Sequence, residues 1–443
     1  MKNKIIQGDS LEELKKLPDN SVDAVVTDPP YGLGFMNKEW DSPKKHRELV
    51  ERERKRSAER KEQGKSPTDA PFSQSVQPGL AIKGAKEGRW FQEWCELWSK
   101  ELLRILKPGG YFLSFSATRM YHRMVCGIED AGFEIRDMIS WLYGSGFPKS
   151  LNVGKQIKKI DKNNNDWDSF GTALKPAVEP IVITRKPLSE KNVALNVLKW
   201  GTGGINIDAC RVGTEQLGGG TMPNLRDVGK MSKESMGIDK LSFGQNPRPA
   251  ERKEYPTYQG RFPANLILDE EAGKLLDEQS GQSTSKKLDG SSFKVEDNGE
   301  YVSNVYGKYK AQNTIRGHND KGGASRFFYC AKASKKERNL GCEEMEDIKG
   351  GSYQFKQDGS LDGKIPIKKN KHPTVKPLSL IQYLIKLVSK EGAVVLDPFL
   401  GSGTTAIACV KLNRNSIGIE KEEEYVKIAK ARIKPFLEQR KLK

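Results

Sequence analysis

Short apolar runs alternate with polar breaks over the first part of the chain. Lys4–Gln7 predicts a short strand. The next segment carries leucine at every third position and Ser10 stands before it, which predicts a helix with Ser10 as its cap. Val22–Thr27 is almost wholly apolar and predicts a buried strand, which ends at the Asp-Pro-Pro-Tyr sequence of residues 28–31.

The same alternation of strand and helix signals returns after residue 88 and again after His372. The predicted elements are helix Arg89–Leu106, strand Tyr111–Phe115, a helix over about 118–131, strands Glu134–Trp141 and Val178–Thr184, helix Leu378–Val388, strand Ala393–Leu396, helix Thr404–Lys411, strand Ser416–Glu420 and helix Glu422–Ile433. Strands that alternate with helices predict an α/β sheet covered on both faces.

Two segments interrupt this pattern. Residues 44–65, within a segment at 32–88, are dense in Lys, Arg and Glu, so they predict a solvated helix or a mobile loop. Residues 185–368 are rich in Gly, Ser, Asn, Lys and Asp and contain only short apolar islands. We interpret residues 185–368 as a loop-rich insertion.

Composition indicates a core confined to part of the chain. Apolar residues, not counting Gly, make up 36% of the 443 residues, and the segments 44–65 and 185–368 contain few of them. The formal net charge of +17 favours a polyanionic partner such as nucleic acid, although a Lys-rich protein without such a partner has the same charge. No apolar run reaches the roughly 18 residues of a membrane helix and the amino terminus lacks a signal peptide. We therefore expect a cytoplasmic protein without membrane contact.

The six cysteines show no metal-binding pattern. No two are spaced as C-x-x-C and none clusters with the four histidines, so we expect inert thiols and no metal site. No cysteine follows a proline, which removes the Pro-Cys nucleophile used in cytosine C5 methylation.

A glycine-rich segment near the carboxyl end predicts an adenosyl ligand site. The strand at 393–396 continues through Asp397 into Gly401–Gly403 and a helix, whose amino end offers free N–H groups to a closely approaching ligand. Glu420 ends the next strand, where a carboxylate can accept both hydroxyl protons of a ribose. These residues fit an NAD-type site as well as another adenosyl ligand. A P-loop is excluded because no Lys-Ser/Thr follows the glycines.

The place of this segment in the chain bears on that choice. An NAD domain usually opens with the unit of strand, glycine turn and helix and then adds strands, but only 23 residues follow Glu420. The remaining strands must come from the amino-terminal half. We therefore expect a sheet completed in permuted order, with its ligand-binding strands last.

The Asp-Pro-Pro-Tyr segment also ends a strand, where open α/β sheets bind ligands. Pro29 and Pro30 fix φ and remove two backbone donors. Asp28 adds a carboxylate acceptor and Tyr31 adds a flat ring, so the segment is complementary to the exocyclic amine of a nucleobase. Accepting both amine hydrogens, at Asp28 and at the Pro29 carbonyl, favours a pyramidal nitrogen and stabilises its developing positive charge during attack on a methyl sulfonium.

Together these motifs resemble the β group of amino-methylating DNA methyltransferases, which use S-adenosylmethionine and carry their motifs in permuted order. Asp28–Tyr31 matches the DPPY motif, and Phe399–Gly403 matches the F-x-G-x-G motif. The resemblance implies a Rossmann-like methyltransferase fold, which is α/β with a mostly parallel, circularly permuted seven-stranded sheet. The implied domains are a catalytic part at 1–184 with a charged insertion at 32–88, a target-recognition region at 185–368 and a cofactor-binding part at 369–443.

The resemblance also implies the residues of the site. The catalytic residues would be Asp28, Pro29, Pro30 and Tyr31, which would hold and activate a flipped base. The cofactor would be held by Asp9, Thr374, Lys376, Asp397, Phe399, Gly401, Ser402, Gly403, Thr404 and Glu420. Glu420 would hold the ribose hydroxyls and Asp9 would face the adenine amino group of the cofactor. Thr374 and Lys376 would lie near its methionine carboxylate.

We therefore expect a site-specific methyltransferase that acts on double-stranded DNA. Asp rather than Ser before Pro-Pro-Tyr favours adenine N6, and the target base must flip out of the duplex. Cytosine N4 is the alternative within the class, followed by RNA or a protein amide as substrate. A nicotinamide oxidoreductase and a DNA-binding protein without catalysis are alternatives from other classes. Homodimers are common in this family, and the sequence does not identify a restriction endonuclease partner.

Three further features have two interpretations each. Arg52–Arg60 fits a DNA clamp as well as a charged helix. Phe327 and Phe328 favour a buried strand over base stacking. Trp141 and Tyr143 fit either core packing or the border of a base pocket.

Overall fold

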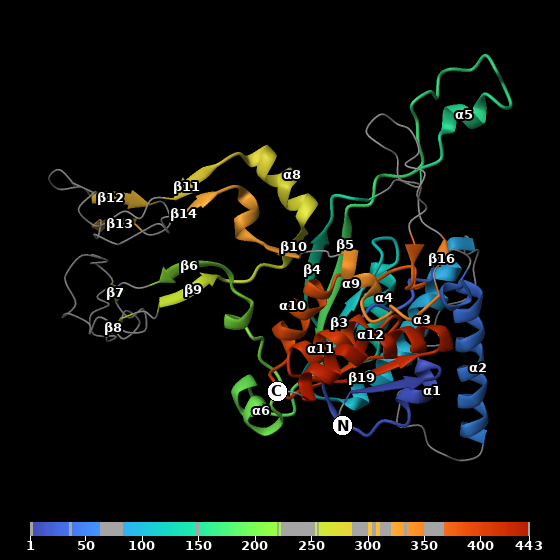
Figure 1. Ribbon diagram of the computed structural model, residues 1–443, viewed down its shortest axis with the longest axis horizontal. Coiled ribbons are helices and arrows are strands. Elements are labelled where there is room, and N and C mark those ends of the chain that lie inside the picture. Colours follow the sequence, from blue (N-terminus) through green and yellow to red (C-terminus); the bar gives the residue numbers. More distant parts are fainter. Residues whose placement is uncertain are drawn as a thin grey trace, which may run out of the picture. The chain divides into compact units, whose positions relative to one another are not determined.

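The computed structural model divides the chain into two compact units (Figure 1). Unit 1 comprises Met1–Cys210, Asn265–Ala272 and Cys330–Lys443, and unit 2 comprises Arg211–Ala264 and Gly273–Tyr329. The residues described by the structure are 3–34, 38–62, 83–146, 150–218, 221–222, 253–254, 257–285, 300–303, 307–310, 320–331, 335–346, 348–349 and 367–441.

A sheet of nine strands, counted over the described residues, forms the centre of unit 1. Its order is β1 (Lys4–Gln7), β19 (Asn415–Glu420), β18 (Val394–Asp397), β2 (Val22–Thr27), β3 (Leu106–Phe115), β5 (Val178–Arg185), β4 (Glu134–Leu142), β10 (Leu266–Asp269) and β15 (Tyr329–Ala331). The first five strands are parallel, β5 is antiparallel to β3 and β4, and β10 is parallel to β4. The predicted α/β fold is confirmed, and β10 and β15 extend the seven expected strands.

Helices cover both faces of this sheet (Figure 1). The connections through α1 (Ser10–Leu14) and α3 (Lys83–Ile105) progress in one direction along the sheet, whereas the connection through α11 (Thr404–Lys411) progresses in the other direction. Because such crossovers are right-handed, α11 lies on the face opposite α1 and α3. α4 (Tyr121–Asp130) packs against α3, while α10 (Leu378–Val388) and α12 (Glu423–Lys441) pack against α11.

Helix α3 presents a continuous apolar stripe to the sheet. Its large side chains recur every three or four residues, so Phe91, Trp94, Trp98 and Leu102 lie on one side of the helix and are buried. The ring of Trp98 meets Phe112 of β3 edge to face, with 5.8 Å between ring centroids. Burial of a side chain of the size of Phe or Leu stabilises the fold by about 1.5–3 kcal/mol.

The strand order reverses between β2 and β18. These strands are parallel neighbours, with Leu396 paired to Val25, although 370 positions separate Thr27 from Asp397. They end side by side, and Thr27 Oγ1 donates a hydrogen bond to Asp397 Oδ1 at 2.6 Å. The connections leave this point toward opposite faces, which opens a crevice at the carboxyl ends of the strands.

The structure decides two predictions about the amino-terminal elements, namely the cap of the first helix and the form of the charged segment at 44–65. Asp9, rather than Ser10, caps α1, because its carboxylate accepts a hydrogen bond from the Leu11 N–H and Ser10 is already the first helical residue. The prediction of Ser10 as the cap is therefore wrong. The charged segment at 44–65 forms a helix, α2 (Pro43–Glu62), over its described residues.

Residues 185–368 contain more regular structure than their composition indicates. Unit 2, taken by itself, includes the antiparallel pairs β6–β9, β7–β8, β11–β14 and β12–β13. The bounds of the other elements are α5 (Val153–Ile157), α6 (Val193–Trp200), β6 (Val212–Gly218), β7 (Thr221–Met222), β8 (Lys253–Glu254), β9 (Thr257–Arg261), α8 (Glu270–Ser280), β11 (Ser283–Ser285), β12 (Glu300–Ser303), β13 (Gly307–Lys310), β14 (Asp320–Gly322), α9 (Lys335–Asn339), β16 (Ile348–Lys349) and β17 (Ile367–Lys368). Within the described ranges, no helix combines the length and apolar character needed to cross a membrane.

A buried ion cluster lies within unit 2. The carboxylate of Asp320 pairs with Arg261 at 2.5 Å and with Arg326 at 2.7 Å. The Phe327 ring lies under both guanidinium groups, at 4.9 Å from Arg261 and 4.2 Å from Arg326. Phe327 belongs to a short 3-10 helix and is 40% exposed, so the prediction that it lies buried in a strand is wrong.

The glycine at the start of α11 generates a prediction about stability. Gly403 has φ +85°, and a Cβ there would lie 2.9 Å from Ala429 Cβ of α12. Gly392 has φ +77°, and a Cβ there would meet no atom within 4 Å, so Gly392→Ala tests backbone strain alone. Strain of this kind costs about 1–2 kcal/mol. We expect Gly403→Ala to lower the unfolding temperature clearly more than Gly392→Ala in thermal denaturation, and equal shifts would contradict the close packing of α11 on α12.

Candidate active site

A cavity of about 1140 Å³ lies in unit 1 at the carboxyl ends of β2 and β18. Its lining includes nearly all of the predicted site residues, namely Asp9, Asp28, Pro29, Pro30, Tyr31, Thr374, Lys376, Asp397, Phe399, Gly401, Ser402, Thr404 and Glu420. Gly403 is the exception, because it packs against Ala429 behind the turn. The two motifs at opposite ends of the chain therefore share one cavity.

The glycine turn forms one wall of this cavity. Gly401 has φ +54°, and a Cβ there would lie 2.7 Å from His372 Nε2, so only glycine fits. Arg432 of α12 is buried behind the turn and donates hydrogen bonds to the Ser402 carbonyl at 2.7 Å and to Thr404 Oγ1 at 3.2 Å. Arg432 was not predicted from sequence, since a single Arg in a charged amphipathic helix gives no signal of burial.

Glu420 lies at the end of β19 beside the glycine turn. Its Oε2 accepts a hydrogen bond from the Gly401 N–H at 2.8 Å, and its Oε1 accepts one from the Glu422 N–H at 2.8 Å. Burial raises the pKa of Glu420 to about 7, despite these two hydrogen bonds. The carboxylate retains free lone pairs on the cavity side and can accept further hydroxyl protons.

Asp397 ends β18 and lines the cavity. Burial raises its pKa to about 6, while hydrogen bonds from Thr27, Thr405 and the Phe399 N–H oppose the increase. Phe399 itself packs its ring against Trp94 and Trp98 of α3, with centroids 5.7 and 5.6 Å away. The pairing of β2 with β18 thus places a buried acid between the glycine turn and the Asp-Pro-Pro-Tyr segment.

Asp9 reaches the same cavity from α1. Parallel pairing of β1 with β19 sets Gln7 beside Glu420, and the Gly8 N–H donates to the Glu420 carbonyl at 2.9 Å. One carboxylate oxygen of Asp9 caps α1, and the other lies 3.9 Å from Lys421 Nζ. The edge strand β1 therefore carries an acidic side chain to the Glu420 side of the cavity.

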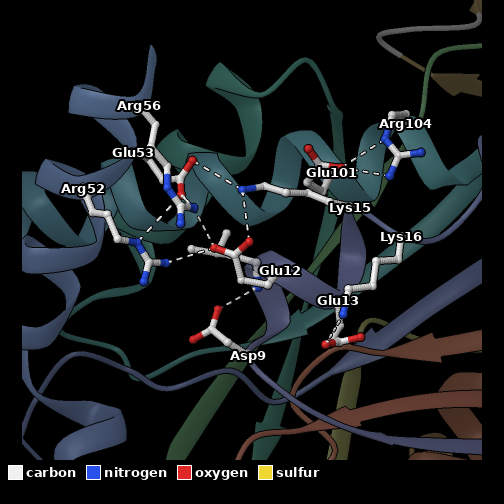
Figure 2. A network of polar contacts seen from close by, with 11 residues as sticks. Asp9, Glu12, Glu13, Lys15, Lys16, Arg52, Glu53, Arg56, Glu101 and Arg104 are labelled. Atoms are coloured by element: carbon white, nitrogen blue, oxygen red, sulfur yellow. Dashed lines mark hydrogen bonds and ion pairs between the residues drawn. The ribbon is translucent and has the colours of Figure 1, made fainter. Parts of the chain in front are cut away.

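Charged side chains of α2 pair with α1 directly beside Asp9, as Figure 2 shows. Arg52 and Arg56 both contact Glu12 Oε1, at 3.2 and 2.8 Å, and Arg56 also contacts Glu53 at 2.8 Å. The hydrogen bond from Arg56 is the largest cause of a lowered pKa at Glu12. These contacts favour the charged-helix interpretation of the basic run at 52–60 over a free DNA clamp.

The Asp-Pro-Pro-Tyr side of the cavity contains a compact charged cluster. Tyr31 Oη donates to Asp28 Oδ1 at 2.6 Å. Lys376 Nζ donates to Asp28 Oδ2 at 2.6 Å and lies 3.2 Å from Glu179 Oε2. The ammonium also lies 4.9 Å from the centre of the Phe115 ring.

This cluster perturbs each of its members. Burial alone would lower the pKa of Lys376, but the carboxylates of Asp28 and Glu179 outweigh burial and raise it well above its usual value. Burial raises the pKa of Glu179, and the Lys376 ammonium only partly opposes that increase. Burial and the Asp28 charge together raise the pKa of Tyr31, which therefore stays protonated.

Several positions differ from the sequence-based expectation. Lys376, expected near a methionine carboxylate, contacts Asp28 in the structure. Thr374 lines the cavity, and its backbone forms a hydrogen bond with the His372 side chain. Trp141 is buried and does not line the cavity, whereas Tyr143 does. Glu179 was missed, although a charged residue at the start of an otherwise apolar strand was a usable signal.

The insertion after the Asp-Pro-Pro-Tyr segment also contributes to the cavity wall. The lining includes Trp40, Asp41, Lys45, His46 and Leu49. Asp41 accepts hydrogen bonds from the backbone N–H groups of Gly32 and Leu33, at 2.7 and 3.2 Å. His46 stacks on Trp94 with 4.1 Å between ring centroids, and burial lowers its pKa to about 4. The aromatic residues within this charged segment were the signal that it folds onto the domain.

Chemically, the cavity offers two separate environments. The side of Asp397 and Glu420 offers buried carboxylates and close backbone approach, which suit hydroxyl and ammonium groups. The side of Asp28 and Tyr31 offers an acceptor edge beside an aromatic ring, which suits a flat base with an amino group. Among the described residues, no group of three or more His, Cys, Asp or Glu side chains is arranged to hold a metal ion.

The permuted sheet and the paired loops define a Rossmann-like α/β fold with its cavity at a topological switch point. The chain belongs to the N6/N4 methyltransferase family, because the model of that family, described as DNA methylase, matches residues 22–431. The family resemblance expected from the sequence is therefore confirmed.

Individual relatives are similar over different shares of the chain. The type II methyltransferase M.HindIII of Haemophilus influenzae is 23% identical over 435 residues, which cover 97% of this chain and 94% of that protein. The type II methyltransferase M2.DpnII of Streptococcus pneumoniae is 40% identical over 110 residues, or 24% of this chain and 41% of that protein.

Two solved structures align with nearly the whole chain. The PvuII DNA methyltransferase, described as cytosine-N4-specific, aligns at a TM-score of 0.40 with 13% identity, covering 100% of this chain and 92% of that one. The M1.HpyAVI–SAM complex aligns at a TM-score of 0.36 with 15% identity, covering 97% of this chain and 98% of that one.

Proposed function

We propose that the chain transfers a methyl group from S-adenosylmethionine to the exocyclic amine of a flipped base in double-stranded DNA, most simply adenine N6. The observation that carries this proposal is the single cavity shared by Asp28–Tyr31 and the glycine turn. Membership of the DNA methylase family supports methyl transfer to DNA as the reaction class. The name of the relative M.HindIII supports site-specific action of the type II kind.

The lining of the cavity fits S-adenosylmethionine. Glu420 would hold the ribose hydroxyls, because its buried carboxylate keeps free lone pairs beside a glycine that admits close approach. Asp397 would pair with the methionine ammonium, and Asp9 with the adenine amino group. When bound, S-adenosylmethionine supplies a methyl group on a positively charged sulfur. No metal is needed for such a transfer.

The Asp-Pro-Pro-Tyr segment would prepare the attacking nitrogen. Asp28 and the Pro29 carbonyl accept the two amine hydrogens, which localises the lone pair and stabilises the charge that develops on the nitrogen. Tyr31 would stack on the base, and its hydroxyl fixes one oxygen of Asp28 at 2.6 Å. Flipping the base costs a few kcal/mol, which stacking and DNA contacts offset.

Two target bases fit the acceptor edge formed by Asp28 and the Pro29 carbonyl. Asp at the first position of the motif favours adenine N6, and cytosine N4 is the alternative with the same acceptor edge. Sequencing of DNA from cells that express the protein, with detection of modified bases, distinguishes the two and gives the recognition sequence. A nicotinamide oxidoreductase or an inactive DNA-binding protein would yield no methylated base.

Unit 2 would supply sequence recognition, in line with the predicted target-recognition region at 185–368. Its surface combines exposed aromatic rings with guanidinium groups, as in nucleic-acid contacts. Phe262 and Tyr258 are 64% and 40% exposed, and Arg211 lies 4.2 Å from the Tyr258 ring. A homodimer is a further expectation from the family, and size-exclusion chromatography with light scattering tests it.

Removal of the Asp28 carboxylate tests the catalytic assignment. We expect Asp28→Ala and Asp28→Asn to lower transfer of labelled methyl groups to DNA by about 100-fold or more, the usual loss of one preorganised electrostatic partner. Binding of S-adenosylhomocysteine, followed by thermal shift, stays near the wild-type level. A variant at Asp28 with wild-type turnover would refute the assigned role.

Glu420 predicts a pH dependence of cofactor binding. Its pKa is about 7, so lowering the pH from 8 to 6 protonates the carboxylate and removes acceptors for the ribose hydroxyls. We expect the affinity for S-adenosylhomocysteine to fall about tenfold over this range. In Glu420→Gln the affinity for S-adenosylhomocysteine is already low at pH 8, and it changes less between pH 8 and pH 6. The change that is left comes from protonation of Asp397. Isothermal titration calorimetry measures both, and an identical slope in the variant would contradict the assignment.

Two arginines test where DNA contacts the protein. Arg119 lines the cavity at an exposed position and has no ion pair with any described residue, whereas Arg56 is held by Glu12 and Glu53. We expect Arg119→Gln to weaken DNA binding and to reduce the slope of log Kd against log salt by about one. Arg56→Gln serves as the matched control with little change. Equal effects of the two substitutions would contradict this placement of the DNA.

A further inference from the structure

Both carboxylate oxygens of Asp28 are engaged in the structure. Tyr31 Oη donates to Oδ1 at 2.6 Å, and Lys376 Nζ donates to Oδ2 at 2.6 Å. The side chain of Lys376 is 10% exposed, so its ammonium is largely removed from water. A target amine that binds Asp28 must therefore share a carboxylate oxygen with Tyr31 or with Lys376, and of these two donors Lys376 carries the positive charge.

Lys376 has a second acidic neighbour from a different strand. Glu179 of β5 lies with Oε2 3.2 Å from Lys376 Nζ, and its side chain lines the same cavity. The ammonium thus stands between two carboxylates, one in the Asp-Pro-Pro-Tyr segment and one in the neighbouring part of the sheet. Lys376 can therefore move away from one carboxylate and still keep the other as an ionic partner.

We propose that Glu179 is a positioning residue of the methyl-transfer site, to which Lys376 moves when the target amine takes its place on Asp28. This inference rests on the proposed function. In the free protein Lys376 neutralises and orients Asp28. In the complex with DNA the amine donates to Asp28, and Glu179 holds the displaced ammonium.

The cost of an unpaired buried charge explains why a second carboxylate is needed. A buried ammonium that loses its only partner is strongly destabilised, whereas Lys376 keeps one of its two ion pairs when it leaves Asp28. Without Glu179, Lys376 would remain on Asp28 and compete with the amine. Glu179 therefore lowers the barrier to base entry without contact with the reacting atoms.

The exchange also stabilises the positive charge that develops on the attacking nitrogen during methyl transfer. The attacking nitrogen becomes positive as it bonds to the methyl group, and a cation beside Asp28 would oppose this change. Movement of Lys376 toward Glu179 increases its distance from that nitrogen. The same Asp28 carboxylate then stabilises the base nitrogen rather than the lysine.

The test compares single and double variants in single-turnover transfer at pH 8, with unmethylated plasmid DNA and saturating labelled S-adenosylmethionine. Glu179→Gln leaves Asp28 as the only ionic partner of Lys376, so we expect the transfer rate to fall about 10- to 100-fold. The double variant Glu179→Gln/Lys376→Gln removes the competing cation, so its rate exceeds that of Glu179→Gln. The KM for the cofactor changes little in Glu179→Gln, because the substitution slows entry of the base and does not affect cofactor binding.

A control variant separates this effect from a general loss of stability. Glu134→Gln makes the same chemical change at an ion pair outside the cavity, where Glu134 contacts Arg185 at 2.6 Å, and retains the wild-type rate. If Glu179→Gln does not fold, Glu179→Asp replaces it, since the shorter carboxylate holds Lys376 less well. Glu179→Asp is then slower than the wild type, and Glu179→Asp/Lys376→Gln is faster than Glu179→Asp.

Each other outcome overturns the inference. A Glu179 variant at the wild-type rate shows that Lys376 needs no second acceptor. A double variant no faster than the matching Glu179 variant shows that Lys376 does not compete with the base. A wild-type protein without methyl transfer contradicts the proposed function and this inference together, whereas an active wild type with either of the first two results contradicts this inference alone.

Discussion

The parallel pairing of β2 with β18 is the constraint on which the site depends. It sets the end of the Asp-Pro-Pro-Tyr strand beside the end of the glycine-turn strand, and the Thr27–Asp397 hydrogen bond joins them at 2.6 Å. Every other part of the site is placed relative to this pair. α11 begins beyond one strand, Asp28 follows the other, and β19 and β1 extend the sheet to bring Glu420 and Asp9 to the same side.

Burial of acidic groups gives this site its chemical character. The pKa values of Asp397, Glu420 and Glu179 are all raised by burial, and the single ammonium of Lys376 lies between two carboxylates. Such an arrangement costs stability in the free protein, because charges are withdrawn from water before a ligand compensates them. The positively charged cofactor and the amine substrate proposed above would supply that compensation, so the same groups that strain the free protein would favour these ligands.

Periodicity along the sequence was sufficient to predict seven of the nine strands described in the main sheet, but not β10 and β15. The alternation of apolar runs predicts β1, β2, α10 and α11 with the bounds that the structure shows, and β2, α10 and α11 each bury a continuous apolar face. The resemblance to the methyltransferase family predicted the site residues, and of these Gly403 alone does not line the cavity. Arg432 could not be predicted, since its role depends on which side chains tertiary packing brings near it, whereas the place of Glu179 at the start of an otherwise apolar strand was a signal that went unused. The cap of α1 was misassigned because Asp9 and Ser10 are adjacent and both are good caps.

The distance along the chain between β2 and β18 also has a consequence for biosynthesis. A ribosome must add some 370 residues after β2 before β18 has emerged, and until then the edge of β2 lacks its neighbour and the cavity lacks one wall. Closing so long a segment makes formation of the site a late and comparatively slow event. A nascent chain would therefore be unable to modify DNA, and premature termination upstream of residue 394 would yield an inert fragment with an aggregation-prone strand edge.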